Sequence, residues 1–314
     1  MTIVPCYVGC DIAKAHLDFF DPSDGAVRRV ANRRDAVDGF LAGLAGRDVF
    51  IVHEATGDYD RALRHGLAAA GLPGVRINPM TARRFAEARG RRAKTDMLDA
   101  RMLADLGATF QPAPDAPPCP EREALTALVR RRDQLVAMRQ AEKVRLKELC
   151  DKEPRDAAIQ ASLDAVITCL SGQVADLDRR IQTRIAASQA AAEDNRLLRT
   201  APGMGPVNAA ACLTLLPELG TLPARKISAL AGLAPFNRDS GARNGKRHIA
   251  GGRSRVRRAL YVAAIAAIRN TPRYKAFYDA VYSRSLTKKV AIIAVARKLL
   301  THLNAMLRDR KAWA

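Results

Sequence analysis

The 314-residue sequence has few aromatic residues, no paired cysteine motif and no long uncharged apolar run. No stretch of about 18 uncharged apolar residues occurs, so no membrane span is expected. No basic segment precedes the apolar N-terminal residues, which argues against a signal peptide. The six cysteines form no CxxC pair, which excludes the usual zinc spacings and favours free thiols in a reducing cytoplasm.

Acidic residues are scarce in the last quarter of the chain. From Gly241 to Ala314 there are 18 lysines and arginines but only two acids, Asp279 and Asp309, in a chain whose net charge is +20. Such a basic segment predicts a polyanionic partner. An anionic membrane surface is the alternative, but aromatic residues that insert into lipid are few (5% of the chain), so nucleic acid is favoured.

Three segments differ in their patterns. Residues 1–110 alternate between strand and helix signals, which predicts an α/β domain with a mixed sheet. Residues 111–197 begin with five prolines in ten positions, typical of a linker, and continue as two long amphipathic helices that form a helical hairpin or a coiled coil. Residues 198–314 are predicted to be mostly helical and basic.

Four acids are candidates for metal binding. Asp11 and Glu54 end two predicted strands, and Asp96 and Asp99 share one face of a predicted helix at i, i+3 spacing. Converged carboxylates repel one another unless cations neutralise them, and oxygen ligands suit Mg²⁺ or Mn²⁺. Two such ions can clamp the attacking and leaving oxygens of a phosphoryl transfer. Taken singly, each acid could also be a solvent-facing residue or a helix cap.

A second candidate site is the glycine-containing turn Pro202–Pro206, similar to the hairpin of a helix-hairpin-helix element. The amides near Gly203 and Gly205, with a helix N-terminus behind them, could contact a phosphate. An ordinary tight turn between helices is the alternative.

The third candidate is Ser240, in a polar, glycine-rich loop. Its hydroxyl is a weak nucleophile unless a base, a metal or positive charge activates it, so a polar serine that only contacts the DNA backbone is the alternative. Ser254 is a rival by the same argument. Basic residues suited to phosphate contacts lie in this loop or soon after it: Arg238, Arg243, Lys246, Arg247, Arg253, Arg255, Arg257 and Arg258. Lys94, near the predicted acids of the first domain, is a further candidate for offsetting phosphate charge.

In their order along the chain these motifs resemble a known family. The strings GCDIAKAHLDF, HEATGDY, INP and AKTDMLDARMLA resemble the RNase H/RuvC-like DEDD domain of a class of bacterial insertion-sequence transposases. The strings APGMGPVNAAACL, LAGLAPFNRDSG, RNGKRHIAGGRSRVRRALYVAA and VARKLL resemble the second domain of the same family. This is the family of bridge-RNA-guided recombinases, relatives of the Piv-type DNA invertases.

The resemblance implies a role for each matched residue. Asp11, Glu54, Asp96 and Asp99 match the four acids that hold divalent metal, Mg²⁺ or Mn²⁺, and Ser240 matches the nucleophilic serine. In this family the serine forms a covalent phosphoserine link to DNA, which a strand hydroxyl later reseals. The serine domain of one subunit completes the DEDD site of another. The implied partners are donor and target DNA, a structured bridge RNA, and further copies of the chain, as a dimer that assembles into a tetramer.

Three other functions remain open from the sequence. A RuvC-like junction nuclease would use the acids and water, with no covalent link. A site-specific DNA invertase would act without RNA. A non-catalytic nucleic-acid scaffold would need only the fold and the basic segment. A bacterial, cytoplasmic protein that associates with the nucleoid when active is expected in the recombinase case.

Overall fold

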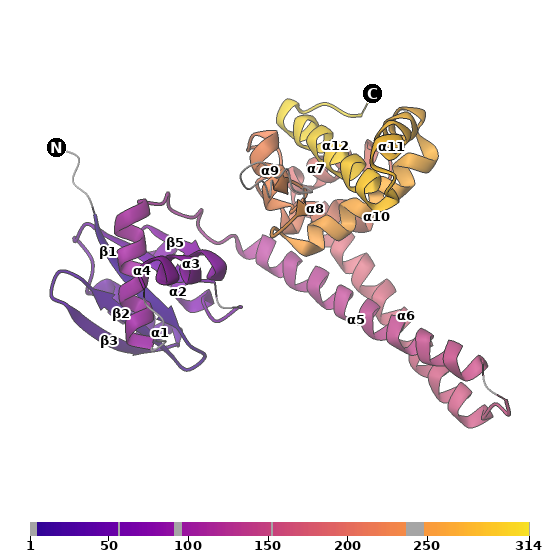
Figure 1. Cartoon of the computed structure of the whole chain (residues 1–314). Coiled ribbons are helices and arrows are strands. Elements are labelled where there is room, and N and C mark those ends of the chain that lie inside the picture. The colour runs from indigo at the N-terminus through magenta and orange to yellow at the C-terminus, as the bar shows by residue number, and fades with distance from the viewer. Residues whose placement is uncertain (1–4, 56, 91–95, 152, 237–247, 314) are drawn as a thin grey trace. The chain divides into compact units, whose positions relative to one another are not determined.

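The computed structural model describes residues 5–55, 57–90, 96–151, 153–236 and 248–313, with only the backbone described at residues 96–98 (Figure 1). These residues divide into two compact units, Met1–Cys119 and Pro120–Ala314. The second unit holds both the predicted helical segment after the prolines and the predicted basic segment. The three-part division at residues 110 and 197 stays a prediction.

The first unit is built on a mixed five-stranded sheet in the order β3-β2-β1-β4-β5. Strands β1, β2 and β3 pair antiparallel, whereas β4 and β5 run parallel to β1. This agrees with the predicted α/β, RuvC-like class. The elements in chain order are β1 (Cys6–Ile12), β2 (His16–Asp21), β3 (Ala26–Ala31), α1 (Arg34–Ala42), β4 (Val49–Glu54), α2 (Arg61–Ala70), β5 (Gly74–Ile77), α3 (Pro79–Ala88) and α4 (Asp96–Phe110).

Helices cover both faces of the central strands, so β4 is buried on both sides and reads as the continuous apolar run VFIVH. Val49 and Ile51 pack with α1 and α2 on one face. Phe50 and Val52 pack with α4 and α3 on the other. This alternation fixes which residues of the neighbouring strands share the face of α4.

The second unit begins with a long helical hairpin. Helices α5 (Pro120–Cys150) and α6 (Ala157–Ala186) pack side by side (Figure 1). An ion pair between Arg132 and Asp178 (2.6 Å) joins them. Leu135 and Leu170 are the last buried residues before the turn, and no described residue beyond them is buried. The hairpin confirms the two predicted helices, but nothing identifies it as a coiled coil.

The rest of the second unit is helical, with one two-stranded ribbon. Its elements are α7 (Gln189–Thr200), α8 (Pro206–Leu215), α9 (Ala224–Leu230), β6 (Pro235–Phe236), β7 (His248–Ile249), α10 (Ser254–Asn270), α11 (Pro272–Ser285) and α12 (Lys288–Asp309). Helices α10 and α11 are separate, because Pro272 occupies the first turn of α11, where proline favours a new helix start.

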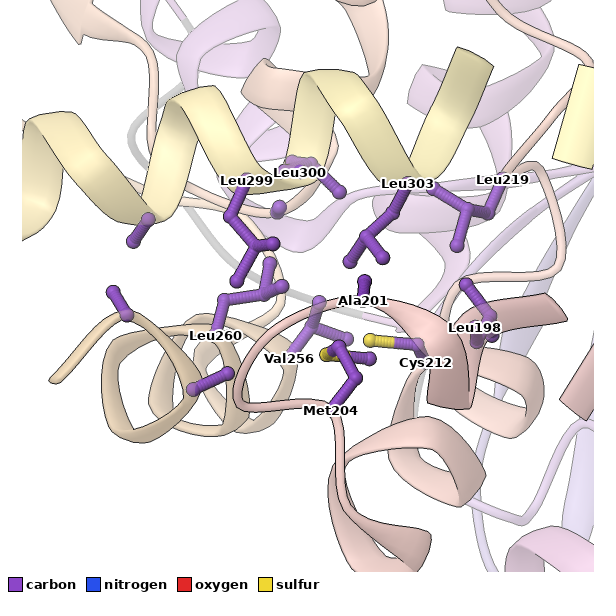
Figure 2. Close-up of a cluster of buried hydrophobic side chains, with 14 of the residues drawn as sticks. Leu198, Ala201, Met204, Cys212, Leu219, Val256, Leu260, Leu299, Leu300 and Leu303 are labelled. Atoms are coloured by element: carbon purple, nitrogen blue, oxygen red, sulfur yellow. The ribbon is translucent and has the colours of Figure 1, made fainter. Parts of the chain in front are cut away.

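Helix α12 lies along the core of this unit (Figure 2). Leu299, Leu300 and Leu303 pack toward Leu260 of α10 and Leu219. Among the described residues, α12 is the one helix long and apolar enough to cross a membrane by length and composition, but half of that window is buried inside the unit. Its apolar character is therefore explained by core packing.

The turn before α8 owes its two glycines to different causes. Gly203 has φ +77°, and a Cβ there would lie 2.1 Å from the carbonyl oxygen of Ala263 in α10. Asn208 closes the turn by donating a hydrogen bond to the Gly203 carbonyl (3.0 Å). Gly205, by contrast, has open space around it. Packing accounts for Gly203, the structure does not confirm a helix-hairpin-helix, and the phosphate contact stays a prediction.

We predict that Gly203→Ala lowers the free energy of unfolding of the second unit by about 2–4 kcal/mol, because the left-handed backbone and the clash with Ala263 both oppose a side chain. Gly205→Ala is the matched control two residues away, and it should cost about 1 kcal/mol or less. Urea unfolding followed by the fluorescence of Trp313, the one tryptophan of the chain, measures both. Equal losses in the two variants would contradict this account.

Candidate active site

One row of polar residues crosses the sheet of the first unit. Asp11 in β1 lies opposite Asp18 in β2, and Asp18 lies opposite Arg29 in β3. On the other side, Cys10 is in register with His53 of β4, so the next residues, Asp11 and Glu54, follow on neighbouring parallel strands. Residues in register point to the same face, so the row runs Arg29, Asp18, Asp11, Glu54.

Helix α4 covers this same face. A Cβ on Gly9 would lie 1.9 Å from the carbonyl oxygen of Ala100, so α4 rests directly on the β1 backbone. Further along the helix, Gly107 lies against Tyr7 and Val52. The helix therefore runs opposite to β1, which places its N-terminal turn at the end of the strand that carries Asp11.

This geometry brings three of the four predicted acids to one edge of the sheet. Asp11 and Glu54 come from strand ends, and Asp99 comes from the first turns of α4. All three side chains are half-buried. The backbone of Asp96 begins the same helix, but its side chain lies outside the described residues.

The donor set has the chemistry of a hard-cation site. Carboxylate oxygens are the ligands that Mg²⁺ and Mn²⁺ take, and two strands and a helix supply them from a rigid base. Among the side chains that the structure describes, no three His, Cys, Asp or Glu form a group able to hold a metal ion. Asp11, Glu54 and Asp99 thus share the ligand type and the sheet edge that such an ion needs, and the complete set with Asp96 stays a prediction.

Sequence reasoning missed Asp18. Its side chain is 2% exposed, and Arg29 donates two hydrogen bonds to it, from Nε (2.8 Å) and from Nη2 (2.7 Å). The alternation in HLDFF puts Asp18 on the face opposite Leu17 and Phe19, which was a usable signal. That Asp18 lies next to Asp11 depends on the β1–β2 register, which the sequence does not give.

A second buried polar group lies at the same edge, on the face of α1 and α2. His53 is buried, and Asp60 nearby is ion-paired with Arg76 (3.0 Å). Burial lowers the pKa of His53 to about 4, although Asp60 opposes this shift. His53 is therefore neutral at pH 7 and acts as a buried residue of the fold, next to Glu54 on β4.

The loops at this edge are tied together. Asn32 donates from Nδ2 to the carbonyl oxygen of Ala13, after β1, and to that of Tyr59, after β4 (2.9 and 3.0 Å). The backbone that follows Asp11 is thus linked to the backbone that follows Glu54, which limits how far the two carboxylates can separate.

Three of the predicted nucleic-acid contacts are engaged inside the second unit. Arg253 binds Glu218, Arg255 binds Asp133 of α5, and Arg257 donates to the carbonyl of Gly251 (2.7 Å). Burial alone would raise the pKa of Glu218, but hydrogen bonds from Arg253 lower it below its usual value. These arginines hold the hairpin and the loop before α10.

Arg258 is exposed. Whether any of these four residues binds nucleic acid stays a prediction. The remaining predicted site residues lie outside the described part of the chain: Lys94, Arg238, Ser240, Arg243, Lys246 and Arg247. The short ribbon of β6 and β7 flanks the segment that contains Ser240.

Both halves of the chain match known protein families. Residues 8–152 match a transposase family named DEDD_Tnp_IS110, and residues 195–279 match the transposase IS116/IS110/IS902 family. The first match contains the four acids, and the second contains Ser240.

Individual relatives point the same way. The pilin gene-inverting proteins of Moraxella bovis and Moraxella lacunata are each 29% identical over 265 residues, covering 83% of this chain and 80% of theirs. An uncharacterized 43.6 kDa protein of insertion element IS110 from Streptomyces coelicolor is 29% identical over 213 residues, covering 60% of this chain and 53% of its own.

We predict that Gly9→Ala is strongly destabilising although it adds only one methyl group. The new Cβ meets the α4 backbone and must displace the helix that carries Asp99. The free energy of unfolding should fall by about 3 kcal/mol or more. Gly39→Ala in α1 is the control, since nothing lies near its Cβ and alanine favours helices. Thermal unfolding of both variants tests this, and a Gly9→Ala protein as stable as wild type would contradict it.

Protonation of His53 should weaken the fold in mild acid. The unfolded imidazole takes up its proton near pH 6.5 and the folded one only near pH 4, so stability is full above pH 6.5 and is lost as the pH falls toward 4. The expected loss between pH 7.5 and pH 5 is about 2 kcal/mol. Urea unfolding followed by circular dichroism should show this loss in wild type and a smaller one in His53→Gln. Equal pH dependence in the two would contradict the assignment.

Proposed function

Because the chain belongs to the IS116/IS110/IS902 family of transposases, we propose that it is the recombinase of a bacterial insertion sequence, and that it cleaves and exchanges DNA strands through a phosphoserine intermediate. The observation that carries the proposal is the convergence of Asp11, Glu54 and Asp99 at one sheet edge, under a helix fixed by Gly9. DNA is the substrate, and the bacterial cytoplasm is the site of action.

The carboxylates define one half of the reaction. In this proposal Asp11, Glu54, Asp96 and Asp99 hold a divalent cation, Mg²⁺ or Mn²⁺, which when bound supplies positive charge to the scissile phosphate and favours the alkoxide form of a nearby hydroxyl. The chain's own part is to fix the oxygen ligands. For Asp11, Glu54 and Asp99, the sheet register and the α4 contact do so.

Ser240 supplies the other half. Its Oγ attacks the phosphorus of a DNA phosphodiester, the bond to one strand oxygen breaks, and that oxygen leaves as a hydroxyl after taking up a proton. The phosphoserine ester keeps the energy of the broken bond. A hydroxyl from the exchanged strand then attacks the phosphorus, and the serine hydroxyl is restored. The sequence neighbours Arg238, Arg243, Lys246 and Arg247, together with Lys94, would offset charge on the phosphate.

The acids and the serine belong to different compact units. We propose that the serine segment of one subunit completes the carboxylate site of another, within a dimer that pairs into a tetramer, since recombination joins four DNA ends. In the same proposal a structured bridge RNA selects the donor and target sequences by base pairing. The protein then needs only to bind the shape and backbone of the nucleic acid.

Site-specific inversion is the second candidate outcome. The similarity to two pilin gene-inverting proteins over most of the chain favours it. Inversion and transposition share the chemistry of cleavage and rejoining, so the two differ in which DNA ends are brought together and in whether an RNA is needed.

We predict a covalent protein–DNA adduct that requires both Ser240 and the carboxylates. Labelled donor and target DNA, the flanking non-coding RNA of the element and Mg²⁺ are incubated with wild type, Ser240→Ala and Asp11→Asn, and adducts are resolved on a denaturing gel. Each substitution should reduce adduct formation by about 1,000-fold or more, because each removes a group that acts on the reacting phosphate.

Ser254→Ala is the matched control, since Ser254 is an exposed serine in the same basic region and the alternative nucleophile. It should leave the adduct unchanged. Cleavage without an adduct, unaffected by Ser240→Ala, would replace the proposal with a nuclease that uses water. An adduct that forms equally well without RNA would favour the RNA-independent invertase.

A further inference from the structure

A charged pair extends the carboxylate row beyond the four predicted acids. Asp18 and Arg29 lie opposite each other on β2 and β3, next to Asp11 on β1. The carboxylate of Asp18 is 2% exposed, whereas the guanidinium side of the pair, Arg29, is 59% exposed. His16 adds a third polar group, with Nε2 3.6 Å from Asp18. The pair thus has a buried anchor and an accessible cation.

The fold by itself does not call for an ion pair at this position. A buried ion pair often contributes no more stability than apolar side chains of the same volume. On the other face of β2, Leu17 and Phe19 do pack as apolar residues in the core. Asp18 also places a second carboxylate directly opposite Asp11, which is unfavourable unless a cation lies close by.

Arg29 supplies that cation, and its position also suits the binding of a phosphate. A DNA phosphate that reaches the carboxylate edge brings more negative charge to an acidic site. A guanidinium binds phosphate with directed N–H donors. The two hydrogen bonds to Asp18 restrict the Arg29 side chain before any ligand arrives, so less conformational entropy is lost on binding.

The same face carries a second guanidinium. Arg101 of α4 lies over the ring of Phe20, 4.9 Å from its centroid, and Phe20 is two residues from Asp18 on β2. Arg101 over β2 and Arg29 on β3 therefore place two guanidinium groups on the face that carries the carboxylate row. A phosphate backbone that passes the site would meet positive charge there.

Resting on the proposed function, we propose that Arg29 is a phosphate-binding residue beside the carboxylate site, and that Asp18 is the positioning residue that holds it there. The ligand is the backbone of the DNA strand that enters the site. Arg28 is the natural contrast, because it precedes Arg29 on β3, points to the other face and pairs with Asp24.

The test measures how DNA affinity depends on salt. A fluorescein-labelled DNA duplex of arbitrary sequence is titrated with the full chain in EDTA, over a range of salt concentrations, by fluorescence anisotropy. The proteins are wild type, Arg29→Gln, Asp18→Asn, the double variant and Arg28→Gln. Arg29→Gln should flatten the slope of log affinity against log salt by about 1, and weaken binding about five- to tenfold at moderate salt. Arg28→Gln should change neither quantity.

Asp18→Asn should weaken binding part of the way, because Arg29 stays charged but is no longer held. The double variant should match Arg29→Gln, since positioning matters only while the guanidinium is present. Arg29→Lys keeps the charge and loses the two-bond geometry, so it should restore part of the slope, and it serves as the informative variant if Arg29→Gln folds poorly. A purely structural role would shift unfolding temperature and leave the salt slope intact.

Two results would overturn the inference. If Arg29→Gln behaves like Arg28→Gln, Arg29 binds no phosphate. If the losses from Asp18→Asn and Arg29→Gln simply add, Asp18 is not the positioning residue. Failure of the proposed function is a different outcome, since wild type would then bind no DNA at any salt concentration or form no adduct in the trapping assay.

Discussion

The contact between α4 and β1 is the constraint on which the first unit depends. A helix can rest on a strand backbone only where no side chain intervenes, and Gly9 provides that gap on the strand. Gly107 provides a second gap on the helix, against Tyr7 and Val52. Two points of close approach fix both the position and the direction of α4. Backbone packing therefore places Asp99 at the same edge of the sheet as Asp11.

Several basic side chains of the second unit are engaged in ion pairs and hydrogen bonds within the protein itself. The basic C-terminal quarter indicates a polyanion, yet Arg253, Arg255 and Arg257 bind Glu218, Asp133 and backbone carbonyls. The Arg253–Glu218 and Arg255–Asp133 pairs join segments far apart in sequence, the second of them α10 to α5, whereas Arg257 holds the loop just before its own helix. A count of basic residues thus overstates the positive charge available to a ligand. Exposed residues such as Arg258 are better evidence for a polyanionic partner.

The part of the candidate site that lies at strand ends could be predicted from the sequence. Asp11 and Glu54 were predicted to meet because each ends an apolar strand, and the parallel pairing of β1 with β4 confirms that they share an edge. The place of Asp18 beside Asp11 could not be predicted, because it depends on the register of the antiparallel strands β1 and β2. The packing role of Gly203 could not be predicted, because its positive φ and the closeness of Ala263 are visible only in three dimensions, and its phosphate contact stays a prediction.

The split between the two units has a consequence for control of the chemistry. In the first unit, the sheet register and α4 hold the carboxylates of Asp11, Glu54 and Asp99 in place. The proposed nucleophile, Ser240, belongs to the second unit and is flanked by a ribbon of two-residue strands. In the proposed reaction, the serine of one subunit acts at the carboxylates of another, so cleavage requires both subunits. Strand cleavage is then coupled to assembly, and a DNA end is cut only when its partner is present.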